Sequence, residues 1–182
     1  MAETEAKTDG AAAEQTGPRV AVRVQYIKDL SFENPGAPRA LADGATAPQI
    51  QVNVDVEARP MGKDHYEVAL HVNATAARND ANVFVIELVY AGLFALENIP
   101  RDKLETICLV ECPRLLFPFA RRIVADTTRE GGFPPLLLDP IDFGRLLQRH
   151  RGAVPGAPAA TPTAPPAPAA PAAKGAAPKR GK

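Results

Sequence analysis

The chain has 182 residues, with 21 basic and 21 acidic side chains, a length that suggests one domain plus tails. The charge is unevenly distributed: the last 32 residues, from Arg151, hold five basic side chains and no acid, so they carry +5 and the body carries −5. A body of that sign repels nucleic acid and suits a basic partner, and its longest apolar run, 83–96, is too short and too charged to span a bilayer.

The first 18 residues are rich in Ala, Glu and Thr and contain no apolar segment typical of a secretory signal. We predict a disordered N-terminal tail over 1–18 and a reduced, cytoplasmic protein.

Three segments alternate apolar with polar side chains, namely 20–26, 50–57 and 66–73. An alternation with period two predicts strands with one dry and one wet face, so Val20, Val22, Val24 and Tyr26 are expected to share a face. In the segment 83–96 both the odd-numbered and the even-numbered residues are apolar, except for Glu87. This pattern predicts a fourth strand that is covered on both sides.

The connections between these strands differ in length. The segments 58–64 and 77–82 are short and carry turn formers, so the second, third and fourth strands are predicted to form a meander of hairpins. The segment 33–48 is long for a hairpin and is predicted to be a crossover or a functional loop.

Helices are predicted after the strands. The first covers 98–111, a second starts at about Arg114 or Pro118 and ends at Gly131 and Gly132, and a third covers 138–150 with Asp139 as its N-cap and Pro140 in its first turn.

This order of elements predicts an α+β domain over 19–150, in which helices pack on one face of a four-stranded antiparallel sheet. The segment 151–182 is rich in Pro and Ala and basic, and we predict an extended, disordered tail.

Catalytic chemistry finds little support. His65 and His71 are about 20 Å apart along one strand, and Cys108 and Cys112 have no further cysteine or histidine motif with which to bind zinc. We interpret the histidines as surface or hydrogen-bonded residues and the cysteines as core or interface residues. There is no glycine-rich phosphate loop and no GxSxG motif. We therefore predict a protein with no catalytic residues, no metal and no cofactor.

The apolar surface remains to be explained. One layer of helices covers only one face of a sheet, so the other apolar side chains either pack on another copy of the chain or stay open for an extended apolar ligand. The two interpretations are compatible.

Four segments, "YIKDLSFENPGAP", "HYEVALHVNATA", "FVIELVYAGLF" and "CPRLLFPFARRIVADTTREGGFPPLLLDPIDFGRLL", resemble the SecB family of protein-export chaperones in order and spacing. The resemblance covers about 19–150. It implies the α+β fold above, assembly as a homotetramer (a dimer of dimers), and an ATP-independent cytoplasmic holdase. Such a protein would bind unfolded secretory preproteins in apolar grooves and deliver them to the SecA motor, without binding nucleic acid or inserting into a membrane.

The resemblance also implies site residues. The family's SecA-docking residues correspond to Asp29, Glu33, Val85 and Glu87, which would meet the basic C-terminal zinc-binding segment of SecA. Val85 departs from the commoner leucine but keeps an apolar branched side chain. The client groove would use Ile50, Val52, Val54, Phe143, Leu146 and Leu147.

Several alternatives stay open. The groove residues can also be ordinary core residues, and the basic Pro/Ala-rich tail departs from the short polar or acidic tails typical of the family. The rival functions are a carrier of small apolar ligands, a purely structural oligomer, and a relative that guards an antitoxin.

Overall fold

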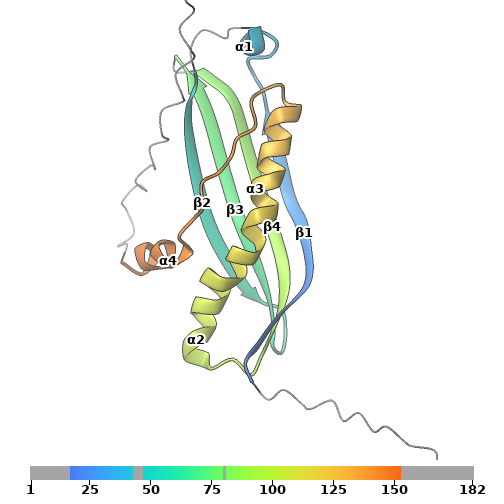
Figure 1. The fold of residues 1–182 in the computed structure, drawn as a ribbon, viewed down its shortest axis with the longest axis vertical. Helices are drawn as coiled ribbons and strands as arrows, with labels where there is room; N and C mark the ends of the chain where they lie inside the picture. Colours follow the sequence, from blue (N-terminus) through green and yellow to red (C-terminus); the bar gives the residue numbers. More distant parts are fainter. Residues whose placement is uncertain (1–16, 43–46, 80, 153–182) are drawn as a thin grey trace, which may run out of the picture.

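The computed structural model describes residues 17–42, 47–79 and 81–152. Its strands are β1 (Arg19–Glu33), β2 (Gln49–Pro60), β3 (His65–Arg78) and β4 (Ala81–Glu97), and its helices are α1 (Arg39–Ala42), α2 (Arg101–Thr106), α3 (Cys112–Glu130) and α4 (Phe143–Gly152). The strands form one antiparallel sheet in the order β1-β4-β3-β2, with α3 lying across one face and α4 beside β2 (Figure 1). The predicted α+β architecture is confirmed. The predicted tails lie almost entirely outside the described residues.

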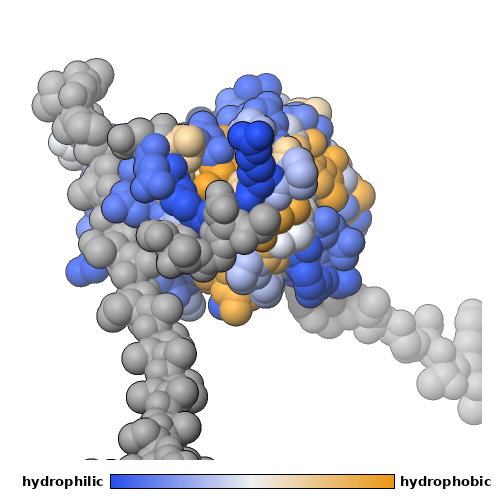
Figure 2. All heavy atoms as spheres, turned by 90° about the horizontal axis from the view of Figure 1, so that it is seen from above, coloured by the Kyte–Doolittle hydropathy of each residue, from blue (hydrophilic) through white to orange (hydrophobic). Residues whose placement is uncertain are grey.

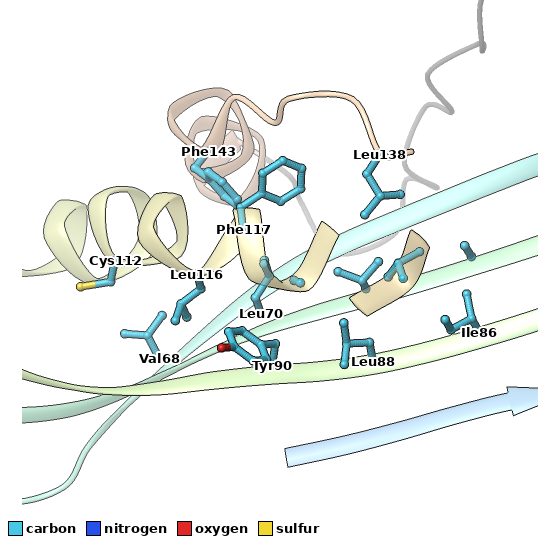
Figure 3. Close-up of a cluster of buried hydrophobic side chains, with 14 of the residues drawn as sticks. Val68, Leu70, Ile86, Leu88, Tyr90, Cys112, Leu116, Phe117, Leu138 and Phe143 are labelled. Carbon is cyan, nitrogen blue, oxygen red and sulfur yellow. The ribbon is translucent and has the colours of Figure 1, made fainter. Parts of the chain in front are cut away.

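Side chains of the central strands separate onto two faces, because successive residues of a strand point to opposite sides. The even-numbered residues of 68–76 and 84–96, such as Leu70 and Leu88, are buried on the side of α3, where Leu116 also lies (Figure 3). In β2 the alternation confirms the sequence prediction, since the even-numbered residues of 50–56 are half-buried on this side. We call the opposite side the open face, which is formed by the odd-numbered residues of 51–59, 67–75 and 85–93 together with Val24, Tyr26, Asp29, Ser31 and Glu33.

The first strand departs from its predicted alternation. Its register against β4 shifts between Val22 and Val24 and again between Ile27 and Asp29. Each shift inserts one extra residue, and a bulge of this kind moves all following side chains to the opposite face. The prediction that Val20, Val22, Val24 and Tyr26 share one face is therefore wrong. Val22 lies opposite Phe94 on the helix side, whereas Val24 lies opposite Leu93 on the open face.

The long connection after β1 is a crossover, one of the two predicted alternatives. β1 and β2 occupy opposite edges of the sheet, so the chain between Glu33 and Gln49 must pass the ends of β4 and β3. The crossover contains α1; residues 43–46 lie outside the described residues.

The helical region is more continuous than the sequence predicted. α2 leads into a π-helical turn, Ile107–Glu111, which runs directly into α3. α3 begins at Cys112, close to the predicted start at about Arg114, whereas the alternative start at Pro118 is wrong, because Pro118 lies inside the helix and Pro113 lies in its first turn. A proline ring crowds the carbonyl group four residues earlier in a regular α-helix, and the wider turn before Pro113 relieves this crowding.

The start of α4 also differs from the prediction. The helix begins at Phe143, after an extended segment, and not at Pro140. The Oδ1 atom of Asp142 accepts a hydrogen bond from the backbone N–H of Arg145 at 3.0 Å, so Asp142 caps the helix in place of Asp139.

A buried threonine anchors the segment that connects α3 to α4. Thr128 is fully buried, and its hydroxyl group donates to the carbonyl oxygen of Val124 and accepts from the N–H of Leu136 at 2.9 Å. Replacing Thr128 by valine leaves the Leu136 N–H without this partner. The free energy of unfolding is expected to fall by about 1–3 kcal/mol. Urea unfolding of T128V, with T127V as the half-buried control on the same helix, tests this prediction. Equal stability of the two variants would contradict it.

Candidate functional site

The four predicted SecA-docking residues come together at one end of the open face. Glu33 lies directly opposite Val85, and Asp29 lies opposite Val89 four residue pairs away along the strands. Glu87 lies between them, opposite Ser31 on β1 and Asn73 on β3. The structure therefore places three carboxylates along one face of β1 and β4, with the half-buried Val85 opposite Glu33 at the end of the row.

Hydrogen bonding and exposure leave this cluster available to a partner. Asp29, Glu33 and Glu87 are exposed, and Asn73 donates a hydrogen bond from its Nδ2 atom to Glu87 Oε1 at 2.9 Å. Among the described residues, no cation lies within ion-pair distance of these three carboxylates. Three neighbouring negative charges without counter-charges attract a basic ligand.

The bulge at Lys28 explains why these acids share a face with Tyr26. The extra residue places Tyr26 and Asp29, three apart in the sequence, on the same side of β1, where strict alternation would separate them. A prediction from period two alone assigns these two side chains to different faces.

A polar cluster that the sequence analysis missed lies farther along the open face. Glu67 is buried, accepts a hydrogen bond from the Tyr26 hydroxyl group, and forms an ion pair with Lys28 Nζ at 2.7 Å. The hydrogen bond from Lys28 lowers the pKa of Glu67, and the hydrogen bond to Glu67 raises the pKa of Tyr26 to about 12. This cluster ties β1 to β3 across β4. No signal in the sequence singles it out, because it depends on the register of strands far apart in the chain.

The six predicted groove residues fall into two groups. Ile50, Val52 and Val54 are half-buried on the helix side of the edge strand β2, and Leu146 on α4 is also half-buried. Phe143 and Leu147 are buried, with 1% and 7% of their surface exposed.

Packing explains why Phe143 is closed to a ligand. Its ring meets the ring of Phe117 edge-on with centroids 6.1 Å apart, and Figure 3 shows it pointing down from α4 toward α3. Phe143 and Leu147 hold α4 against the rest of the domain, so an apolar ligand reaches them only if α4 moves. A small hollow remains beside them, lined by Val56, Leu109, Leu146, Leu147 and His150.

A third surface is apolar and lies along β1 and α3. Val20, Val22, Ile27 and Leu30 on the outermost strand are each 39–48% exposed, and Leu115 and Phe119 on α3 are 47% and 48% exposed. The end view of the molecule likewise shows hydrophobic residues at the surface beside hydrophilic ones (Figure 2). Among the described residues, β1 pairs with β4 alone, so its other edge has unpaired backbone groups. An apolar strand edge of this kind pairs readily with another chain.

The histidines and cysteines have ordinary structural surroundings. Cys108 and Cys112 are buried, and burial raises the pKa of their thiols to about 11 and about 12. His71 lies 3.7 Å from Glu57, and His150 lies 3.5 Å from Asp55. In the part of the chain that the structure describes, no three His, Cys, Asp or Glu side chains are grouped to hold a metal ion. No helix of that part is long and apolar enough to cross a bilayer.

Comparison with known sequences gives consistent matches. A family model described as preprotein translocase subunit SecB matches residues 13–153. The protein-export protein SecB of Maricaulis maris is 53% identical over 153 residues, covering 82% of this chain and 88% of the relative. The corresponding protein of Parvibaculum lavamentivorans is 51% identical over 152 residues, covering 83% of this chain and 90% of the relative.

The fold is also similar to a solved structure. A SecB-like chaperone of Mycobacterium tuberculosis, determined in complex with an antitoxin peptide, superimposes with a TM-score of 0.57 at 17% identity. The match covers 68% of this chain and 91% of that chain, and it shows a common fold. Together with the sequence matches, these findings show that the chain belongs to the SecB family of chaperones in protein export.

Proposed function

We propose that this protein is an ATP-independent cytoplasmic holdase that binds unfolded secretory preproteins and delivers them to SecA. The observation that carries the proposal is the separation of two surfaces on one sheet. Asp29, Glu33 and Glu87 lie on the open face, whereas the half-buried apolar residues of β2 lie on the helix side. A motor and a client can then bind at the same time.

Charge and shape support SecA docking at the open face. A basic segment laid across β1 and β4 meets three exposed carboxylates, and Val85 offers a small apolar contact among them. Charges around the rim of an interface raise the association rate and select the partner, while the apolar contact adds affinity. Asp29, Glu33, Val85 and Glu87 are therefore the proposed SecA-binding residues.

Edge position and exposure support a client groove along β2. Among the described residues, β2 pairs with β3 alone, so its outer edge has backbone groups that an extended client can pair with. Ile50, Val52, Val54 and Leu146 would supply the apolar floor. Phe143 and Leu147, which are buried in the single chain, would join this floor only after α4 moves.

Weak binding at several grooves suits a holdase. Apolar burial contributes about 25 cal/mol per Å², while ordering an unfolded client costs about 1 kcal/mol or more per residue, so one short segment binds weakly. Several grooves on one oligomer raise the overall affinity about 10²–10⁴-fold through effective concentration. A slowly folding preprotein is then retained, and a fast folder escapes. No nucleotide is required for this cycle.

The exposed apolar surface supports assembly as a homotetramer built from two dimers. Pairing of β1 edges between two copies satisfies their free backbone groups and buries Val20 and Val22. Leu115 and Phe119 on α3 offer a second patch for joining two such dimers.

Two measurements on the purified protein test the proposed function. It is expected to capture purified SecA in a pull-down assay and to suppress aggregation of a denatured preprotein without nucleotide. Copurification of a small apolar molecule, together with failure in both assays, would instead identify a carrier and overturn the proposal.

Removing residues 153–182 is expected to leave the oligomer and the suppression of aggregation unchanged. The packed core ends at α4, where Leu147 is the last buried residue, so the truncation removes no core contact of the described fold. Light scattering measures the mass of the oligomer, and the aggregation assay measures the holdase activity. Loss of either property in the truncated protein would contradict the prediction.

A further inference from the structure

The open face lacks a cover in the part of the chain that the structure describes. The helix α3 packs on the buried even-numbered residues of β3 and β4, whereas Asn53, Asp55, Asn73 and Glu87 on the opposite side are exposed. A sheet face of four strands with polar side chains is stable in water, and it is also a broad platform for a charged segment.

The charges on this face are unevenly paired. Glu57 forms an ion pair with Arg59 at 2.7 Å, and Glu67 forms one with Lys28 at 2.7 Å, so this half of the face is close to neutral. The other half carries Asp29, Glu33 and Glu87, which form no ion pair with a described residue, and Asp55 in the row of Asp29, which lies 3.5 Å from His150. The unbalanced negative charge is therefore concentrated at the end of the face formed by the last residues of β1.

The C-terminal part of the chain leaves the fold at the rim of this face. His150, near the end of α4, lies with its Nε2 atom 3.5 Å from Oδ1 of Asp55. Asp55 belongs to the open face and lies in the same row of paired residues as Asp29, through His71 and Val89. The last described residue, Gly152, follows two positions after His150.

The remaining 30 residues have the complementary charge. They contain Lys174, Lys179, Arg180 and Lys182 and no acid. Three strand spacings and four residues along a strand separate Asp55 from Glu33, which is about 20 Å. A flexible chain of 22 residues, the distance in sequence from Gly152 to Lys174, spans about 26 Å on average and about 68 Å in an extended polyproline conformation. The basic end can therefore reach all three carboxylates.

We infer that the basic end of the tail, residues 174–182, docks on the acidic end of the open face of its own chain. The contact is electrostatic and weak, because exposed ion pairs contribute little each, but the tether supplies an effective concentration in the millimolar range. This docking stands independently of SecA. Its consequence rests on the proposed function: the tail competes with the basic segment of the motor for the same carboxylates.

The experiment compares the native protein with a variant in which Lys174, Lys179, Arg180 and Lys182 are all replaced by glutamine. The methyl resonances of Val85 and Val89 report on the open face, and those of Leu116 report on the core on the other side of the sheet. At low salt the native and neutral tails are expected to give different Val85 and Val89 shifts and the same Leu116 shift. The difference is expected to vanish near 1 M salt, where the Debye length is about 3 Å.

Three controls make this result decisive. In an E87Q background, neutralising the tail is expected to change the chemical shift of Val85 less than in the native background. The reason is that the carboxylate of Glu87, with which the basic tail interacts, is then absent. In a second control, the labelled native chain is reassembled into oligomers with a large excess of unlabelled, tail-neutral chains. Its Val85 and Val89 resonances are expected to keep the chemical shifts of the native protein. Loss of these shifts there would assign the tail to a neighbouring copy and overturn docking on the same chain. Identical Val85 and Val89 shifts in the native protein and in the tail-neutral variant at low salt would also overturn the docking. This is the result expected if the tail binds the acidic residues of 1–16 instead.

The competition has its own measurement. The tail-neutral variant is expected to bind SecA about two- to fivefold more tightly at low salt, because it no longer has a tethered competitor. Equal affinities would overturn the competition. If the Val85 shift is observed but no variant binds SecA, the proposed function fails while the docking stands. If SecA binding depends on Glu87 but the shifts coincide, the docking fails and the proposed function stands.

Discussion

Replacing Glu87 by lysine is expected to weaken SecA binding about tenfold or more at low salt, with client binding unchanged. Glu87 is exposed at the centre of the acidic cluster, because it lies opposite Ser31, between Asp29 and Glu33 on β1. A lysine at this position repels a basic segment and attracts the two remaining carboxylates. Titration of SecA at two salt concentrations measures the effect, which is expected to shrink as salt screens the charges.

Two variants separate charge from structure in this prediction. E87Q removes the charge but keeps a side-chain oxygen that accepts the hydrogen bond from Asn73, and we expect it to lose part of the affinity. D102K makes the same change in net charge at an exposed position in α2, at the other end of the molecule, and we expect it to bind SecA normally. If E87K and the parent bind SecA equally well, the docking site lies elsewhere.

Replacing Val52 and Val54 by serine is expected to lower the affinity for an unfolded preprotein about tenfold. Both side chains are half-buried on the helix side of β2, and the exposed part of each would be buried by a bound client. Losing two partly buried valines removes roughly 1–3 kcal/mol of apolar burial from the complex. The measurement is a titration of a permanently unfolded preprotein, repeated with SecA to show that motor binding is retained.

The matched control for the groove is the double variant Q51S/N53S. It alters the same strand, but Gln51 and Asn53 point to the open face, so client affinity is expected to stay at the parent value. Light scattering on each variant establishes that the oligomer is intact, since β2 also contributes to the fold. An intact V52S/V54S oligomer that binds clients with parental affinity would move the groove away from β2.

The sequence-based prediction of the strands was most accurate where one physical signal acted alone. The alternation in 50–57 and 66–73 gave the correct faces because β2 and β3 pair without a bulge, so period two holds from end to end. In β1 the same reasoning failed for Val24 and Tyr26. Two bulges reset the alternation there, and they become visible only in the register against the partner strand.

The helices show a similar division. Apolar spacing was sufficient to predict helical structure around 98–132, but the sequence could not show that a π-helical turn joins α2 to α3 and removes the expected break at the prolines. Asp139 and Asp142 are both acceptable caps by residue type, since each precedes residues suited to a first turn. The buried ring of Phe143, which packs against Phe117, decides between them by fixing where the chain turns into α4.

By itself, the sequence determined the α+β class, the order of strands and helices, and the acids that the family resemblance marks for partner binding. These features follow from local periodicity and from residue identity, and both can be read from the sequence without knowing which distant segments are in contact. Only the tertiary structure decided that Asp29, Glu33, Val85 and Glu87 form one patch, that Phe143 and Leu147 are closed off in the core, and that the basic tail begins beside the open face. The physical reason is that register, bulges and helix docking are set by contacts between segments far apart in the chain.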